Sequence, residues 1–172
     1  MLIRPATDQD WPGIFAFYRT VMAEGRTYAF PPGQSLDEAR PWWMEQPPGR
    51  TVVAVDDAGA ILGSAKMGPN RPGRGSHIAT ASFLVNPAHQ GRGVGRALGT
   101  HVLDSMRADG YHGIQFNAVV EVNHPAVHLW KSLGFRVIGT VPEAFDHPDA
   151  GLVGLHVMYQ GLGPRGQEST GR

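Results

Sequence analysis

Cysteine is absent from this sequence of 172 residues. Its absence excludes disulfide bonds, thiolate metal ligands and a covalent thiol intermediate. Net charge is also absent, because 15 lysines and arginines balance 15 aspartates and glutamates, which argues against a nucleic acid partner recognised through a bulk electric field. No apolar run approaches the roughly 20 residues of a membrane helix, and the N-terminus lacks a signal pattern. We therefore expect a cytoplasmic protein with no nucleic acid or membrane partner.

The histidines show no spacing typical of metal ligands. His124, His128, His147 and His156 lie in the second half of the chain without a matching set of neighbouring ligands. We predict that no metal is bound.

Glycine, in contrast, is concentrated at one junction. An apolar, β-rich run over 78–85 is followed by Gly91, Gly93 and Gly95, after which apolar residues recur at helical spacing from Val94 to Met106. Glycines let main-chain N–H groups approach a ligand, and the first turn of a helix has up to four N–H donors without intrahelical partners. The pattern predicts a strand, an anion-binding turn and a helix, with a diphosphate as the ligand.

Two other glycine fingerprints fail at this junction. A nucleotide P-loop needs Lys-Ser or Lys-Thr after its last glycine, where this sequence has Arg96-Ala97. A dinucleotide fingerprint begun at Gly91 or Gly93 ends on Arg96 or Leu98, and neither side chain is small enough for close helix–strand packing.

Strand and helix patterns alternate along the rest of the chain, which is long enough for one domain. We expect helices over about 10–22, from Ser35, over about 94–106 and after Asn123, with a long loop over 142–151 and a polar, flexible tail over 161–172. The segments 24–32 and 68–76 are each either a loop over a site or a plain connection. The expected strands are 2–4, 51–55, 61–67, 78–85, 113–120, 135–141 and 152–159.

Two stretches resemble the GNAT superfamily of acyl-CoA-dependent N-acetyltransferases. The residues Gln90-Gly91-Arg92-Gly93-Val94-Gly95 are similar to the signature Gln/Arg-x-x-Gly-x-Gly/Ala, and Asn123 to Phe135 is similar to Asn-x-x-Ala-x-x-Leu-Tyr-x-x-x-Gly-Phe. The resemblance covers about residues 2–160 and is closest to small-molecule members such as phosphinothricin and amino-acid N-acetyltransferases. It implies a single α/β domain over 1–160 with the GNAT fold: a mixed central sheet of about six to seven strands, flanked by about four helices and splayed at the cofactor site.

The resemblance also implies acetyl-CoA as co-substrate and a set of residues that contact it. Main-chain groups of 83–85 would bind the pantetheine arm, the turn would bind the pyrophosphate, and an N–H near Leu84 would face the thioester oxygen. Asn123 would contact the cofactor arm, cap a helix, or do both. The implied cofactor-binding residues are Phe83, Leu84, Val85, Gln90, Gly91, Arg92, Gly93, Val94, Gly95, Arg96 and Asn123.

The sequence departs from the family pattern at its usual acid and base. Trp130 stands where a tyrosine acid is expected, and an indole N–H cannot serve as that acid. Thr80 and Ala118 occupy the usual glutamate positions. Glu121 and His77 are then the candidate bases, with Glu24 third, although each also fits a surface or hydrogen-bonding role.

The function that the resemblance implies is transfer of an acetyl group from acetyl-CoA to the primary amine of a small molecule, by direct attack in a ternary complex. Acetylation of a protein or peptide N-terminus and a non-catalytic acyl-CoA sensor are the alternatives, and a homodimer is left open. Four aromatic residues of the segment 24–32 and of the second helical region belong either near the acceptor or in the core: Tyr28, Phe30, Trp42 and Trp43.

Overall fold

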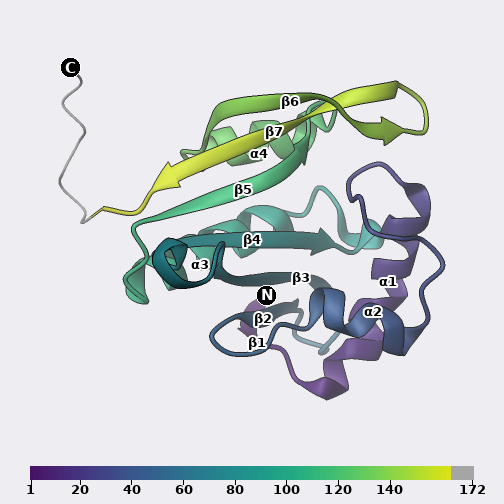
Figure 1. Ribbon diagram of the computed structural model, residues 1–172. Helices are drawn as coiled ribbons and strands as arrows, with labels where there is room; N and C mark the ends of the chain where they lie inside the picture. The colour runs from purple at the N-terminus through teal and green to yellow at the C-terminus, as the bar shows by residue number, and fades with distance from the viewer. Residues whose placement is uncertain (164–172) are drawn as a thin grey trace.

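The elements of the chain assemble around one mixed sheet in the computed structural model, which describes residues 1–163 (Figure 1). Within these residues the sheet has seven strands in the order β1-β2-β3-β4-β5-β7-β6, and every neighbouring pair is antiparallel except β4 with β5. In chain order the elements are β1 (Leu2–Pro5), α1 (Trp11–Glu24), α2 (Leu36–Trp43), β2 (Arg50–Val55), β3 (Ile61–Pro69), β4 (Ile78–Val85), α3 (Val94–Ala108), β5 (Gly113–Val120), α4 (His124–Ser132), β6 (Arg136–His147) and β7 (Gly151–Gly161).

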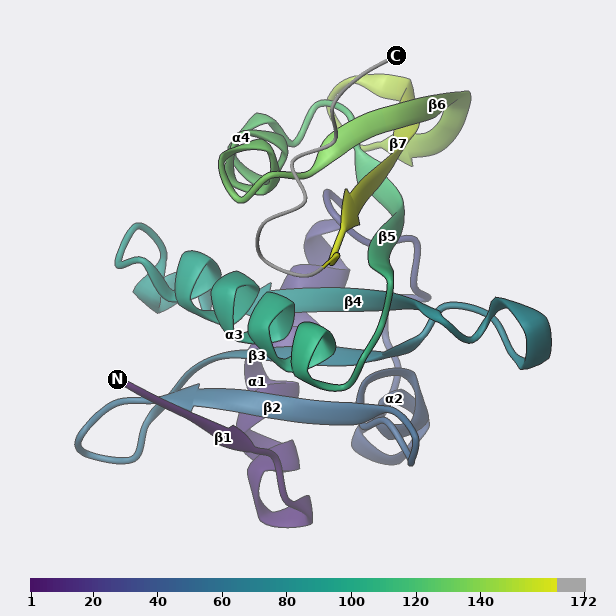
Figure 2. The same ribbon diagram turned by 90° about the vertical axis from the view of Figure 1, so that its left-hand side faces the viewer.

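Helices cover both faces of the sheet, because the buried strands alternate their side chains between two cores. Val52 and Ala54 of β2 pack in the core that includes α3, while Val53 and Val55 pack in the core formed with α1 and α2. Figure 2 shows α3 and α4 on one side of the sheet and α2 on the other.

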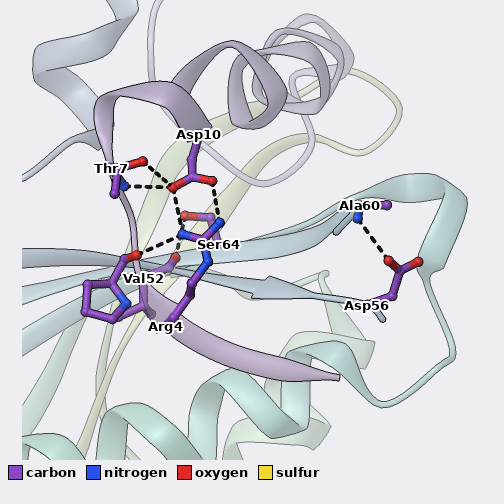
Figure 3. Close-up of polar contacts among 8 residues, drawn as sticks. Arg4, Thr7, Asp10, Val52, Asp56, Ala60 and Ser64 are labelled. Carbon is purple, nitrogen blue, oxygen red and sulfur yellow. Dashed lines mark hydrogen bonds and ion pairs between the residues drawn. The ribbon is translucent and has the colours of Figure 1, made fainter. Parts of the chain in front are cut away.

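An ion pair fixes β1 to the start of α1 (Figure 3). The Arg4 guanidinium donates two hydrogen bonds to the Asp10 carboxylate, at 2.7 and 2.8 Å, and Asp10 also accepts from the N–H and hydroxyl of Thr7. Asp10 is only 8% exposed. The hydrogen bonds from Arg4 hold the pKa of this carboxyl well below its usual range, in spite of burial, which acts in the opposite direction.

The predicted fold class and element order are confirmed, but two boundaries were wrong. β6 continues through most of the segment expected to be a loop over 142–151, because a shift of register between Val141 and Phe145 absorbs Pro142 and its neighbours without ending the strand. Gly161 ends β7 and Leu162 is 4% exposed, so the expected tail does not begin at 161. The rest of that segment, 164–172, lies outside the described residues. No helix within residues 1–163 is long and apolar enough to cross a membrane.

Candidate active site

A cleft opens in the middle of the sheet, where β4 and β5 separate. The two strands pair only at Ile78 with Gly113 and at Ala79 with Ile114, and then diverge (Figure 1). A shift of register between Phe116 and Val119 bends β5 beside the gap. The resulting cleft has a volume of about 340 Å³ and is lined by α1 and the segment after it, β4, β5, α4, β6 and β7.

The β3–β4 ladder determines which main-chain groups face this cleft. Hydrogen bonds from Asn70 N–H to Ile78 O and from Asn86 N–H to Leu62 O lie at its two ends. In an antiparallel ladder, alternate residues direct both main-chain groups to the same neighbour. Even-numbered residues of β4 therefore bond to β3, and odd-numbered residues face the gap left by β5.

The register gives Leu84 and its neighbours Phe83 and Val85 different main-chain partners, although the sequence analysis grouped the three as one cofactor-binding segment. Leu84 lies opposite Ser64 of β3 and is buried, so its N–H belongs to the ladder. Ala81, Phe83 and Val85 direct their main-chain groups into the cleft. The sequence analysis placed the thioester-facing N–H near Leu84, and the register directs the Leu84 N–H to β3 and the Phe83 N–H into the cleft.

The glycine-rich turn follows β4 after a short 3₁₀ helix, Pro87–His89. Gly91 and Gly93 have φ angles of 74° and 78°, and Gly93 caps the N-terminus of α3. Both are exposed, and no atom lies within 4 Å of where a Cβ would stand. The turn therefore leaves the first N–H groups of α3 accessible to an anion. Arg96, in the first turn of the helix, donates to the hydroxyl of Ser132 at 2.8 Å.

Asn123 and Trp130 of the α4 region line the opposite wall. The Asn123 side chain accepts a hydrogen bond from Ala126 N–H at 3.3 Å, so it caps α4 while bordering the cleft. Trp130 is 7% exposed and packs at ring-centroid distances of 4.5 Å from Phe83 and 5.1 Å from Phe116. Its ring therefore forms part of the core and part of the cleft wall.

The other face of the sheet contributes Glu24, Thr27, Tyr28 and Phe30 to the same cleft. Glu24 is the last residue of α1 and is exposed. Trp42 is 42% exposed and lies 5.1 Å from Phe30, measured between ring centroids.

Trp43 differs from its neighbour Trp42, because it is fully buried and donates its indole N–H to the hydroxyl of Ser64 at 2.9 Å. Ser64 in turn donates to Val52 O, and both are drawn in Figure 3. Tyr28 and Phe30 thus line the cleft and Trp42 borders Phe30, whereas Trp43 belongs to the core.

Tyr28 makes a contact that the sequence does not predict. Its hydroxyl accepts a hydrogen bond from Phe83 N–H at 3.0 Å and donates one to Phe83 O at 2.7 Å. The two residues are 55 positions apart in the sequence, and no local pattern connects them. One side chain therefore pairs both of the main-chain groups that Phe83 directs into the cleft.

Comparison with known proteins agrees with this geometry. The model of the acetyltransferase (GNAT) family matches residues 16–135. The chain belongs to this family. A GCN5-related N-acetyltransferase from Kribbella flavida has 56% sequence identity and a TM-score of 0.90, over 93% of this chain and 96% of that one.

Two other similar proteins have names that state a substrate or a cofactor. An L-methionine sulfoximine/L-methionine sulfone acetyltransferase from Pseudomonas aeruginosa is 32% identical over 146 residues, which is 82% of this chain and 83% of that protein. The structure of yncA, a putative acetyltransferase from Salmonella typhimurium with its cofactor acetyl-CoA, has 25% identity and a TM-score of 0.79, over 99% of both chains. The chain spans about half the length of other curated relatives that it matches over shorter segments, 46% of one and 55% of another.

Neither of the two first candidate bases of this GNAT chain is among the residues that line the cleft. The Glu121 carboxylate accepts a hydrogen bond from Gly154 N–H and is not among the lining residues. His77 lies at the opposite end of β4, where it borders a second hollow beside Arg50 and Tyr111. Among the three sequence candidates, the structure brings only Glu24 into the cleft.

Within residues 1–163, no group of three or more histidine, aspartate or glutamate side chains is arranged to hold a metal ion.

Proposed function

We propose that this GNAT protein transfers an acetyl group from acetyl-CoA to the primary amine of a small molecule, by direct attack while both substrates are bound. The observation that carries the proposal is the cleft between β4 and β5. It is lined by Gln90, the residue before the glycine turn, and by α4 on one face of the sheet, and by Glu24 and Phe30 on the other. Two substrates entering from opposite faces would meet beside Phe83.

The residues on the first face fit acetyl-CoA. Gly91 and Gly93 leave the N–H groups at the start of α3 open to the pyrophosphate, and Arg92 and Arg96 add positive charge. Val85 and Asn123 would bind the pantetheine arm, since both border the cleft between the turn and Phe83. When bound, acetyl-CoA supplies the thioester that the amine attacks and a CoA thiol as leaving group.

Phe83 N–H is the donor that we assign to the acyl oxygen. It faces the cleft midway along the unpaired part of β4, between Val85 and Ala81. An N–H at this point would stabilise the negative charge that develops on the oxygen during attack, and removal of one such donor typically costs about 10²–10³ in rate.

Glu24 is the group that we assign to proton removal. An amine with a pKa near 10.4 is neutral only about once in a thousand molecules at neutral pH, an obstacle of roughly 4 kcal/mol. Glu24 can accept the proton directly or through a water molecule, since it lines the cleft and is exposed. Trp130 has no ionisable proton, so it gives no acid assistance to the leaving thiolate, whose parent thiol has a pKa near 8.5.

The acceptor that fits this cleft is a small amine with an apolar body. Phe30 offers aromatic surface in the cleft, which Trp42 extends by packing against it, and Glu24 is the one charged side chain that lines the cleft within the described residues. The amino-acid analogues named for the Pseudomonas aeruginosa relative indicate the size class of such an acceptor.

The test is an assay of CoA release with a panel of amines, followed by mass spectrometry of the products. The panel pairs amino acids with the matching amines that lack a carboxylate, such as phenylalanine with phenethylamine. The proposal expects N-acetylated products and faster turnover of the amines without a carboxylate. A protein that binds acetyl-CoA but forms no free CoA with any amine or peptide would be a sensor. Acetylation of peptides alone would indicate that the substrate is a protein N-terminus.

A further inference from the structure

The Tyr28 hydroxyl occupies the position in the cleft where an acyl carbonyl would bind. It pairs with Phe83 N–H and Phe83 O, at 3.0 and 2.7 Å, and these are the groups that the separation of β5 leaves without a strand partner. Main-chain groups buried without a partner are costly, and the hydroxyl supplies the partner that both groups of Phe83 would otherwise lack.

This arrangement uses the full donor capacity of the phenol. Its single proton points to Phe83 O, so in this state Tyr28 has no proton to donate to a substrate. Burial raises the pKa of the Tyr28 phenol above its ordinary value, so the proton stays in place at neutral pH. Tyr28 therefore occupies both main-chain groups of Phe83 and does not act as an acid.

The segment that carries Tyr28 also borders the acceptor end of the cleft. Thr27 and Phe30 line the same cavity, and Phe30 lies 5.2 Å from Tyr28 between ring centroids. On its outer side, Arg26 forms an exposed ion pair with Asp149 in the turn between β6 and β7. A movement of Tyr28 away from β4 would therefore shift the residues that contact an acceptor.

We propose that Tyr28 is an exchangeable stand-in for the acyl carbonyl: binding of acetyl-CoA displaces its hydroxyl from Phe83, whereas binding of CoA does not. This inference rests on the function proposed above. The thioester oxygen takes over Phe83 N–H, and the free thiol of CoA has no carbonyl with which to do so. Tyr28 makes the site respond to the acyl group, so that the acceptor end rearranges when acetyl-CoA is present and returns once only CoA remains.

Tyr28→Phe tests this exchange, because it keeps the ring among its aromatic neighbours and deletes both hydrogen bonds to Phe83. Calorimetry would measure the Kd of acetyl-CoA and of CoA for the wild type and the variant. Since acetyl-CoA no longer has to displace a hydroxyl, we expect its Kd to fall about tenfold in the variant. We expect the Kd of CoA to stay within about twofold.

Tyr18→Phe is the matched control. The Tyr18 hydroxyl bonds to the Gln34 side chain at 2.9 Å, and its ring packs in the same aromatic core, 6.2 Å from Trp43. It makes no hydrogen bond to β4, so its removal is expected to change neither Kd. An equal change of both Kd values in Tyr28→Phe, an unchanged Kd for acetyl-CoA, or weaker acetyl-CoA binding would overturn the exchange.

A second measurement uses the wild-type chain and does not depend on the folding of the variant. With 3-fluorotyrosine at the four tyrosines, ¹⁹F NMR would follow Tyr28 after its signal is assigned by substitution of the other three. The exchange predicts that acetyl-CoA moves this signal and CoA leaves it in place. The same shift with both ligands would contradict it. Failure of either ligand to bind would instead count against the proposed function.

Discussion

Asp8 and Asp10 are two carboxylates of the same short turn in very different surroundings. Asp10 is nearly buried and accepts two hydrogen bonds from Arg4, whereas Asp8 is exposed and pairs with Arg40 at the surface. Asp10→Asn is expected to lower the free energy of unfolding by about 2 kcal/mol, because it removes the negative charge that accepts the hydrogen bonds of Arg4 at a buried position. Asp8→Asn should change it by less than about 0.5 kcal/mol. Urea denaturation of both variants measures the difference, and equal effects would contradict this assignment.

The same pair predicts a dependence of stability on acid. Since the pKa of folded Asp10 lies below that of the unfolded chain, its contribution is complete above the unfolded value of about 3.9 and is lost as the pH falls toward the folded pKa. The difference in unfolding free energy between wild type and Asp10→Asn should therefore be constant near neutral pH and shrink below about pH 4. A difference that stays constant down to pH 2 would count against the ion pair as its source.

Glu24 and Glu121 offer a matched test of the proposed base. Glu24→Gln should lower kcat about a hundredfold with little change in the Kd of acetyl-CoA, because the amide cannot take the proton of the amine. Glu121→Gln should keep kcat close to that of the wild type, since an amide oxygen can still accept from Gly154 N–H. Steady-state kinetics decides between them, and a loss confined to Glu121→Gln would restore the first candidate of the sequence.

Single residues of this site were the hardest to predict. Trp42 and Trp43 are adjacent and identical in type, but Trp42 is exposed beside Phe30, whereas Trp43 is buried and hydrogen-bonded to Ser64. The choice between Glu24 and Glu121 depends on how β5 and α1 are placed in space, which no local pattern contains. The contact of Tyr28 with Phe83 joins two distant segments for the same reason.

The role of the turn between β4 and α3 in CoA binding can be tested with two alanine variants whose backbone strain is equal. Gly93 and Gly59 have φ angles of 78° and 83°, and both have open space where a Cβ would stand. Alanine at either position should therefore cost a similar roughly 1–2 kcal/mol of stability. Only Gly93→Ala should also weaken CoA binding, since only its Cβ would approach the pyrophosphate. Calorimetry that finds equal CoA affinity in both variants would remove the turn from the cofactor site.

Elements with a clear period or a strong turn signal were predicted well. The run over 78–85 has the composition of a strand, and the apolar positions of α3 repeat at helical spacing. The glycines between them indicate a turn that joins a strand to a helix. β6 escaped prediction beyond Val141, because Pro142 and a Glu143 with a positive φ interrupt the alternation while the pairing with β7 resumes at Phe145.

The whole molecule depends on one interruption in its sheet. Because β4 and β5 pair only at their first residues, a cleft opens between them, and residues of α1 and of α4, from opposite faces of the sheet, line it. The face that we propose for the cofactor could be predicted from the sequence, since the glycine turn and Asn123 are local signals. The acceptor face did not, because its lining comes from side chains of a connecting segment whose path depends on the tertiary structure.

Direct attack within a ternary complex is the central claim, and initial rates of CoA release test it most directly. With acetyl-CoA and an amine varied together, the account predicts intersecting double-reciprocal lines, because the sequence contains no cysteine and no serine in a recognised nucleophile elbow to carry the acetyl group. It also predicts that the protein keeps its mass after incubation with acetyl-CoA alone. Parallel lines, together with a protein heavier by one acetyl group, would contradict the claim.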